Sequence, residues 1–378
     1  MGMKRTGISD LPLHHGSCPP WLFVRMKDML RSISEIIILE YGKDEFLKRL
    51  SNPFFFQSLG CVVGWDWHSS GLTTTLTGAL KEVLKGENIG VVVAGGKGKT
   101  SLKTPKEIRE LANKLSLPST KEEKLIYVSK MSAKVDNAVL QDGFTLYHHT
   151  IFFDERGKWV VIQQGMNTDK RYARRYHWLS DNVKSFVEEP HTAIASDIEQ
   201  KVVLDMTSKE SKDAQKTCVD LVKDNPKHIY HDFLLLRSSS QKTILHFLKK
   251  RKVENIDYLK MPWNLNWKVL KKAYEIQPRN YEELIGIKGF GPSTVRGLAY
   301  VANLIYGKPI SWKDPVKFSF AYGGKDGVPR PVDKKAMDES IKFLREILEK
   351  TEIERKKKLG MLKKLERLVP ILNRHQLK

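Results

Sequence analysis

A β-hairpin in the middle of the chain is the feature that most limits its possible folds. Residues 144–153 and 158–164 are rich in β-branched and aromatic residues, and the turn Asp154-Glu155-Arg156-Gly157 separates them. Two such runs joined by a tight turn are typical of antiparallel strands. The first half of the chain is therefore expected to contain a sheet.

The pattern of secondary structure changes near residue 200. Before it, we expect strands over residues 60–66 and 89–94, helices over 21–41, 43–50 and 71–84, and two helices that open with the capping boxes Thr104/Glu107 and Thr120/Glu123. Beyond residue 198 nearly every segment has helical period, including a basic helix over residues 359–372. The sequence thus predicts an α+β N-terminal domain with a β-hairpin-containing sheet, residues 1–200, followed by an all-α domain, residues 201–378.

The chain is strongly basic. Its 378 residues include 65 Lys and Arg against 44 Asp and Glu, which leaves a formal net charge of +21. Polyanions are the first partners to consider, because each cation that neutralises a phosphate releases condensed counterions. No apolar stretch approaches the roughly 20 residues that span a bilayer, so we expect a cytoplasmic protein with no membrane partner. Cys18, Cys61 and Cys218 lie far apart, which argues against a disulfide framework or a zinc finger.

A glycine-rich segment in the second half carries the strongest signal. Residues 284–299 place Gly289-Phe290-Gly291 between two helical runs. The segment resembles the helix-hairpin-helix of DNA repair and recombination proteins, expected here over about residues 278–305. That resemblance implies phosphate binding by backbone amides at the start of the second helix, without readout of base sequence. The residues expected to bind DNA there are Lys288, Gly289, Phe290, Gly291, Ser293, Thr294 and Arg296.

Two other basic segments are candidate DNA contacts. Residues 95–100 form a glycine-rich turn after a strand, but position 93 is Val where a P-loop requires glycine, so Lys97 and Lys99 are expected to contact nucleic-acid phosphates rather than ATP. Arg171, Arg174 and Arg175 alternate with aromatic residues, a composition that suits stacking on single-stranded or branched nucleic acid. A solvated helix face is the alternative for these arginines.

Acidic and imidazole side chains gather around the hairpin. If its turn sets the register, His148 and His149 lie opposite residues around Gln163 and Gln164, so that one His and one Gln share a face. Such a group could hold Mg²⁺ or Mn²⁺, which activates water and offsets charge on a scissile phosphate. The alternative is that each His is an ordinary half-buried strand residue. The expected catalytic residues are Asp136, Asp142, His148, His149, Gln163, Asp66 and His68, with Asp136, Asp142 and His149 as metal ligands.

The segment after the glycine-rich turn also resembles the DNA glycosylases of the helix-hairpin-helix superfamily. Those enzymes carry a Gly/Pro loop and then a catalytic Asp, and Gly307-Lys308-Pro309 and Asp314 follow here in that order. Ser293 occupies the position where lyase-competent members carry lysine, so a Schiff-base lyase is not expected. Asp314 is either the catalytic acid of a monofunctional glycosylase or a cap of the following helical segment.

Several segments together resemble one family over most of the chain. The prokaryotic, largely archaeal family called domain-of-unknown-function 763 is similar in Asp66-Trp67-His68-Ser69-Ser70-Gly71, in Ala173-Arg174-Arg175-Tyr176-His177-Trp178, and in residues 5–14, 95–99, 141–149, 163–167 and 318–327. The resemblance implies an association with DNA processing.

Three functions remain open from the sequence. The first is a metal-dependent, structure-specific DNA endonuclease that acts on branched, flapped or damaged DNA in repair or recombination. The second is a monofunctional glycosylase, and the third is a DNA-binding adaptor without catalysis. Symmetric cutting of a junction would require a homodimer, and other repair or recombination proteins are possible partners.

Overall fold

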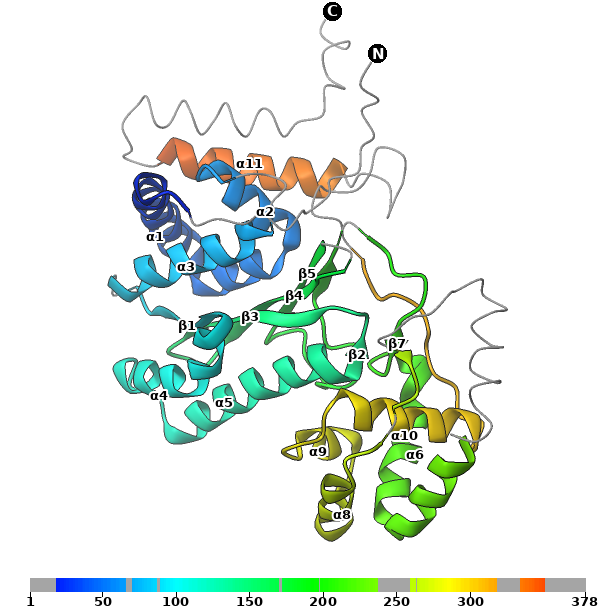
Figure 1. Cartoon of the computed structure of the whole chain (residues 1–378). Helices are drawn as coiled ribbons and strands as arrows, with labels where there is room; N and C mark the ends of the chain where they lie inside the picture. Colours follow the sequence, from blue (N-terminus) through cyan, green and yellow to red (C-terminus); the bar gives the residue numbers. More distant parts are fainter. Residues whose placement is uncertain are drawn as a thin grey trace, which may run out of the picture.

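A five-stranded antiparallel sheet forms the centre of the molecule (Figure 1). The computed structural model describes residues 18–65, 70–86, 89–169, 172–196, 198–236, 259–262, 264–317 and 334–350. The strand order is β1-β3-β4-β5-β6, with bounds β1 (Val91–Lys97), β3 (Thr145–Asp154), β4 (Trp159–Asn167), β5 (Tyr172–Leu179) and β6 (Ala193–Ala195). A separate ladder pairs β2 (Leu140–Gln141) with β7 (Leu204–Asp205).

The predicted hairpin is formed by β3 and β4 in the predicted register. His148 lies opposite Gln164 and His149 opposite Gln163, with a bulge between Leu146 and His148. Asp154 fixes the turn, because its carboxylate accepts hydrogen bonds from the backbone N–H groups of Arg156 and Lys158. The expected strand over residues 89–94 is β1, which pairs with β3.

Helices α1 (Pro20–Ser51), α2 (Pro53–Val62), α3 (Gly71–Gly86) and α11 (Lys334–Lys350) cover one face of the sheet (Figure 1). Phe152 and Val160 of the sheet pack into the same core as these helices. The break expected between residues 41 and 43 is confirmed as a kink, where Gly42 has φ of 86° inside α1. Helix α11 packs against α1 and α2 although it lies far beyond residue 200.

The strand predicted over residues 60–66 is wrong, because residues up to Val62 belong to α2. Pro53 occupies the first turn, and the side chain of Asn52 accepts from the backbone N–H groups of Phe54 and Phe55, so the chain enters a helix here. Every residue of α2 is buried. A fully buried helix has no polar face, and its periodicity therefore resembles that of a buried strand.

The other face of the sheet is covered by α4 (Thr104–Lys114), α5 (Ser119–Lys134) and a π-helical turn, η2 (Val135–Val139). The N-cap of each helix lies one or two residues before the predicted capping residue, Thr104 or Thr120, and neither capping box forms. The hydroxyl of Thr104 donates to the carbonyl of Ser101. The carboxylate of Glu107 instead accepts from the N–H of Gly95 at 2.7 Å, which ties α4 to the end of β1.

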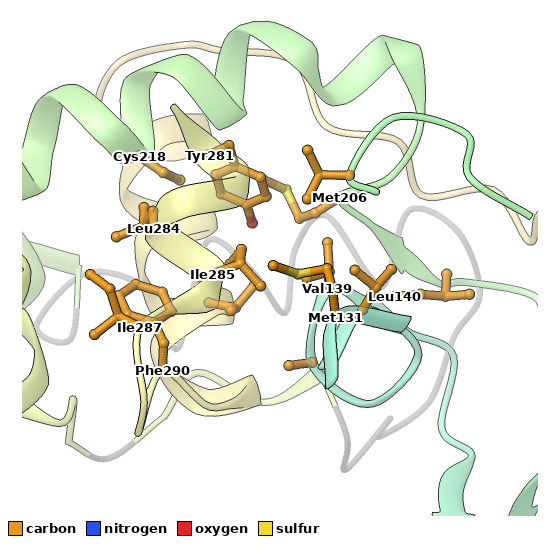
Figure 2. Close-up of a cluster of buried hydrophobic side chains, with 14 of the residues drawn as sticks. Met131, Val139, Leu140, Met206, Cys218, Tyr281, Leu284, Ile285, Ile287 and Phe290 are labelled. Carbon is orange, nitrogen blue, oxygen red and sulfur yellow. The ribbon is translucent and has the colours of Figure 1, made fainter. Parts of the chain in front are cut away.

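A second, helical region of the chain continues the core of this face. It contains α6 (Lys212–Lys223), α8 (Trp267–Ile276), α9 (Tyr281–Gly286) and α10 (Pro292–Leu304). Two short 3-10 turns precede helices: η1 (Gly98–Lys103) precedes α4, and η3 (Lys209–Ser211) precedes α6. Figure 2 shows Tyr281 and Ile285 of α9 directed toward Met131, Val139 and Met206. The helical region is therefore packed on α5 and η2 through apolar side chains.

Some expectations lie outside the described residues. They are the basic helix over residues 359–372 and the family segments over residues 5–14 and 318–327. Among the helices that are described, none has the length and apolar character needed to cross a bilayer.

We predict that Gly95→Ala destabilises the protein while Gly78→Ala does not. Gly95 has φ of +98°, and an added Cβ would lie 2.2 Å from the backbone oxygen of His149 on the paired strand. The strained conformation and the overlap should together lower the free energy of unfolding by about 2 kcal/mol or more. Gly78 lies inside α3 with nothing within 4 Å of an added Cβ, so Ala there should be neutral or stabilising. Equal denaturation midpoints for the two variants would contradict this prediction.

Candidate functional site

The two strand histidines point to opposite faces of the sheet. Nε2 of His148 lies 3.0 Å from the hydroxyl of Thr77 on α3, whereas Nε2 of His149 lies 2.8 Å from the hydroxyl of Ser129 on α5. Nδ1 of His149 lies 2.9 Å from Oε1 of Gln163, so one His and one Gln do share a face. The expected grouping of both histidines in one site is wrong, because adjacent strand residues face opposite ways.

Asp136 is the centre of a buried polar network on the α5 face. It sits in η2, and its Oδ2 accepts from Nε2 of Gln163 at 2.5 Å and from the indole N–H of Trp178 at 2.9 Å. Its Oδ1 lies 2.5 Å from Nε2 of His191. Since the Gln163 amide donates to Asp136, its carbonyl accepts from Nδ1–H of His149.

Asp142 belongs to a second buried network, built on an arginine between two carboxylates. Nη1 of Arg174 donates to Asp142 at 2.9 Å, and Nη2 donates to Asp314 at 2.6 Å, with all three side chains 0% exposed. The hydroxyl of Tyr176 and the N–H of Phe144 also donate to Asp142, at 2.8 and 3.1 Å. Burial raises the pKa of Asp142, although the charge of Arg174 opposes that rise.

The expectation that Arg174 and Arg175 contact DNA is wrong, because both side chains are buried under the segments that cover β5. Arg175 faces the α2 side, where its guanidinium lies 4.5 Å from the ring centroid of Phe56 and donates to Nε2 of His177 at 2.9 Å. The third arginine of that prediction, Arg171, lies outside the described residues.

Asp314 is not the cap of a helix. Its oxygens accept from Arg174, from the N–H of Gln200 at 2.6 Å and from the N–H of Val316 at 3.1 Å. Residues 315–317, which follow it directly, are not helical. Asp314 therefore joins the segment over residues 311–317 to the sheet through Arg174.

The expected metal ligands Asp136, Asp142 and His149 do not fit a Mg²⁺ or Mn²⁺ site as they are folded. Every oxygen of the two carboxylates already accepts at least one hydrogen bond, and both ring nitrogens of His149 have partners. A hard cation needs free oxygen ligands. Across the residues that the structure describes, no three His, Cys, Asp or Glu side chains are grouped as a metal site. Asp66 and His68 lie outside those residues.

The turn between α9 and α10 presents free backbone N–H groups to solvent. Gly289 adopts φ of +95°, and the N–H groups of Lys288, Gly289, Gly291 and Ser293 have no acceptor within the described residues. Lys288 and Ser293 are exposed. The turn directly precedes the 13-residue helix α10, whose N-terminal end carries positive partial charge.

Three side chains hold this turn against the N-terminal half of the molecule. Nζ of Lys134 donates to the carbonyl of Phe290 at 2.7 Å, and Nε2 of Gln141 donates to the carbonyl of Pro292 at 2.9 Å. Arg296 donates to Oε1 of Gln141 at 2.6 Å and to the carbonyl of Lys260 at 2.8 Å. Arg296 is thus a positioning residue for the turn and not a free cation.

The remaining expected DNA contacts divide by exposure. Phe290 and Thr294 are buried, which corrects their expected role, because they cannot reach a phosphate from the core. Lys97 ends β1, Lys99 lies in η1, and both are exposed.

Sequence reasoning also missed His191 and Trp178 as partners of Asp136. His191 follows Pro190 in an irregular connector, where no periodicity assigns it a neighbour.

Comparison with known families places the chain. A family model described as "Protein of unknown function (DUF763)" matches residues 7–332. The chain belongs to the DUF763 family. Neither a curated protein nor a solved structure matches it.

The segments that carry the DUF763 resemblance are brought together by the fold. Residues 141–149, 163–167 and 173–178 lie on β2 to β5, where they supply the buried networks around Asp136 and Asp142. In this DUF763 chain, side chains of those segments stabilise the fold through buried hydrogen bonds.

We predict that Arg174→Met destabilises the protein by about 3–5 kcal/mol, because Asp142 and Asp314 would be left buried without their cation. Arg279→Met is the matched control. Arg279 is 86% exposed and pairs with Glu283 of α9, so its loss should have little effect on stability, because solvent screens an exposed ion pair. Chemical denaturation of both variants measures the difference, and similar losses would refute the assigned role of Arg174.

We predict that His148 makes the protein less stable in acid. Burial, with smaller effects from His149 and Lys97, lowers the pKa of His148 from 6.5 to about 3. Between these values the unfolded chain binds a proton that the folded chain does not, so the free energy of unfolding falls as the pH falls below 6.5. The fall from pH 7 to pH 5 should be smaller in His148→Gln by about 2 kcal/mol. Unchanged pH dependence in that variant would contradict the shift.

Proposed function

We propose that this protein binds the backbone of nucleic acid, with DNA as the favoured partner, through a helix-hairpin-helix formed by α9, the turn at residues 287–291 and α10. The observation that carries the proposal is the set of unpaired N–H groups at Lys288, Gly289, Gly291 and Ser293, at the start of α10. Phosphate oxygens are the acceptors that such a helix start favours.

The surroundings of the turn favour an anionic polymer. Lys288 is exposed and forms no ion pair within the described residues, so its ammonium group is available to a phosphate. Val269 of α8 lies close to the turn, since a Cβ added to Gly289 would be 3.2 Å from Cγ2 of Val269, and Lys268, which precedes Val269, is exposed. The net charge of +21 adds a long-range attraction.

The contacts that this surface offers are to phosphates and not to bases. A glycine-tipped turn with backbone donors binds any sequence of the same shape, so we expect sequence-independent affinity that falls as salt rises. A preference for branched, flapped or damaged DNA stays a prediction from the sequence, since Arg174 and Arg175, on which the expectation of branched nucleic acid rests, are buried.

Catalysis stays a prediction from the sequence. The endonuclease hypothesis needs a metal site, and the carboxylates expected to form it are occupied by internal donors. The glycosylase hypothesis needs an accessible Asp314, whose side chain is fully buried against Arg174. The geometry favours the binding function over both.

We predict that Ser293→Asp weakens duplex DNA binding by about tenfold and lowers the salt slope, because a carboxylate would repel phosphate from the free amides. An acidic residue in the first turn favours the helix itself, so the fold should be retained. Ser119→Asp, an exposed position in the first turn of α5, is the matched control and should bind like the wild type. Fluorescence anisotropy of a labelled duplex at several salt concentrations measures both. Equal weakening in the two variants would reject the turn as the binding surface.

A further inference from the structure

A second polar site lies in a cavity of about 240 Å³ between β6, β7 and residues 311–317. A cavity of this size has space for a small ligand and not for a duplex. Backbone hydrogen bonds fix its walls: the N–H of Asp205 donates to the carbonyl of Ser311 at 3.0 Å, and the N–H of Lys317 donates to the carbonyl of Ile194 at 3.2 Å.

His191 lines this cavity with one ring nitrogen in use and one free. Its side chain is 7% exposed, and Nε2 donates to the buried carboxylate of Asp136. Its ring also packs against Trp178, with 4.6 Å between ring centroids. Nδ1 has no partner among the described residues. Asp136 and Trp178 therefore fix the orientation of the ring, and its Nδ1 is available to a ligand.

The cavity also offers cations without internal partners. Lys313 and Lys317 are exposed on the wall formed by residues 311–317, and neither forms an ion pair with a described residue. Glu189, by contrast, is paired with Lys209 at 2.8 Å. Burial raises the pKa of Asp205, whose Oδ1 accepts from the hydroxyl and the N–H of Thr207. Glu210 also lines the cavity and forms no ion pair with a described residue, so the unpaired charges of the lining are two ammonium groups and one exposed carboxylate. The balance of these charges favours an anionic ligand.

Apolar and hydroxyl side chains complete the lining. Ala193, Ile194 and Pro315 provide an apolar surface, while Ser208 and Ser311 carry hydroxyl groups. Ammonium groups suit a phosphate, and an apolar surface beside hydrogen-bonding groups suits a sugar or a base.

We propose that this cavity binds a single nucleotide unit, with its phosphate at Lys313 and Lys317 and its sugar or base toward His191. The choice of a nucleotide over another phosphate ester rests on the proposed nucleic-acid function. The cavity and the turn are supported by one short segment of chain, since η2 carries Asp136 between Lys134 and Gln141, which both bind the turn.

Isothermal titration calorimetry of the full-length protein tests this site, with dAMP, deoxyadenosine and inorganic phosphate as ligands. We expect dAMP to bind more tightly than the other two, because only dAMP fills both regions of the cavity. Lys313→Gln/Lys317→Gln should weaken dAMP binding by about tenfold or more, since each charge-assisted hydrogen bond contributes substantially. Lys124→Gln/Lys130→Gln removes the same charge from exposed positions of α5 and should leave dAMP binding unchanged.

Three results would overturn the proposal: no dAMP binding at millimolar concentration, equal dAMP affinity in the two double variants, or inorganic phosphate that binds as tightly as dAMP. Duplex binding by the same samples separates this site from the turn. Lys313→Gln/Lys317→Gln should retain duplex binding, and Ser293→Asp should retain dAMP binding. A wild-type protein that binds dAMP but no duplex would reject the proposed function and leave the cavity result intact.

Discussion

The buried guanidinium of Arg174 is the interaction on which the rest of the structure depends. It joins Asp142, which follows η2, to Asp314, which lies 140 positions from Arg174 in the chain. A cation in the core is stable only while its counter-charges are in place, so sheet, turn and C-terminal segment must assemble together. The pairing of one arginine with two carboxylates therefore unites the N-terminal sheet and the helical region in a single packed structure, in agreement with their shared apolar core.

The π-helical turn η2 connects the buried polar network to the α9–α10 turn at the surface. Its Asp136 is fixed by Gln163 and Trp178 from the sheet, so the backbone on either side of it has little freedom. Lys134 immediately before it and Gln141 shortly after it both donate to carbonyls of the α9–α10 turn. π-Helical turns are frequently found at functional sites. Here four of the five residues of η2 are buried, and the side chains of Lys134 and Gln141 on either side of it contact the α9–α10 turn.

Local pattern in the sequence predicts the features that depend on local chemistry. The turn from Asp154 to Gly157 predicts the hairpin and the partners of both histidines correctly, because a short turn fixes the register of its strands. Hydrophobic and charge patterns in the sequence give wrong predictions for segments that are completely buried. Helix α2 resembles a strand, and Arg174 and Arg175 resemble surface cations, since nothing in a local window shows that β5 is covered on both faces. The partnership of Asp136 with His191 joins residues 55 positions apart and carries no local signal.

Pairing of the buried carboxylates and of His149 also determines which polar groups are available to a ligand in this fold. Carboxylates and imidazoles near the hairpin have the residue types of a catalytic centre, but each donor and acceptor of Asp136 and His149 is used inside the protein, and using it for a ligand would break a buried hydrogen bond. Unused polar groups occur where the networks end: among the described residues, these include the amides before α10 and Nδ1 of His191. The paired side chains around Asp136 hold the groups at the end of that network in fixed directions, so the interior orients the two surfaces that we propose to bind ligands.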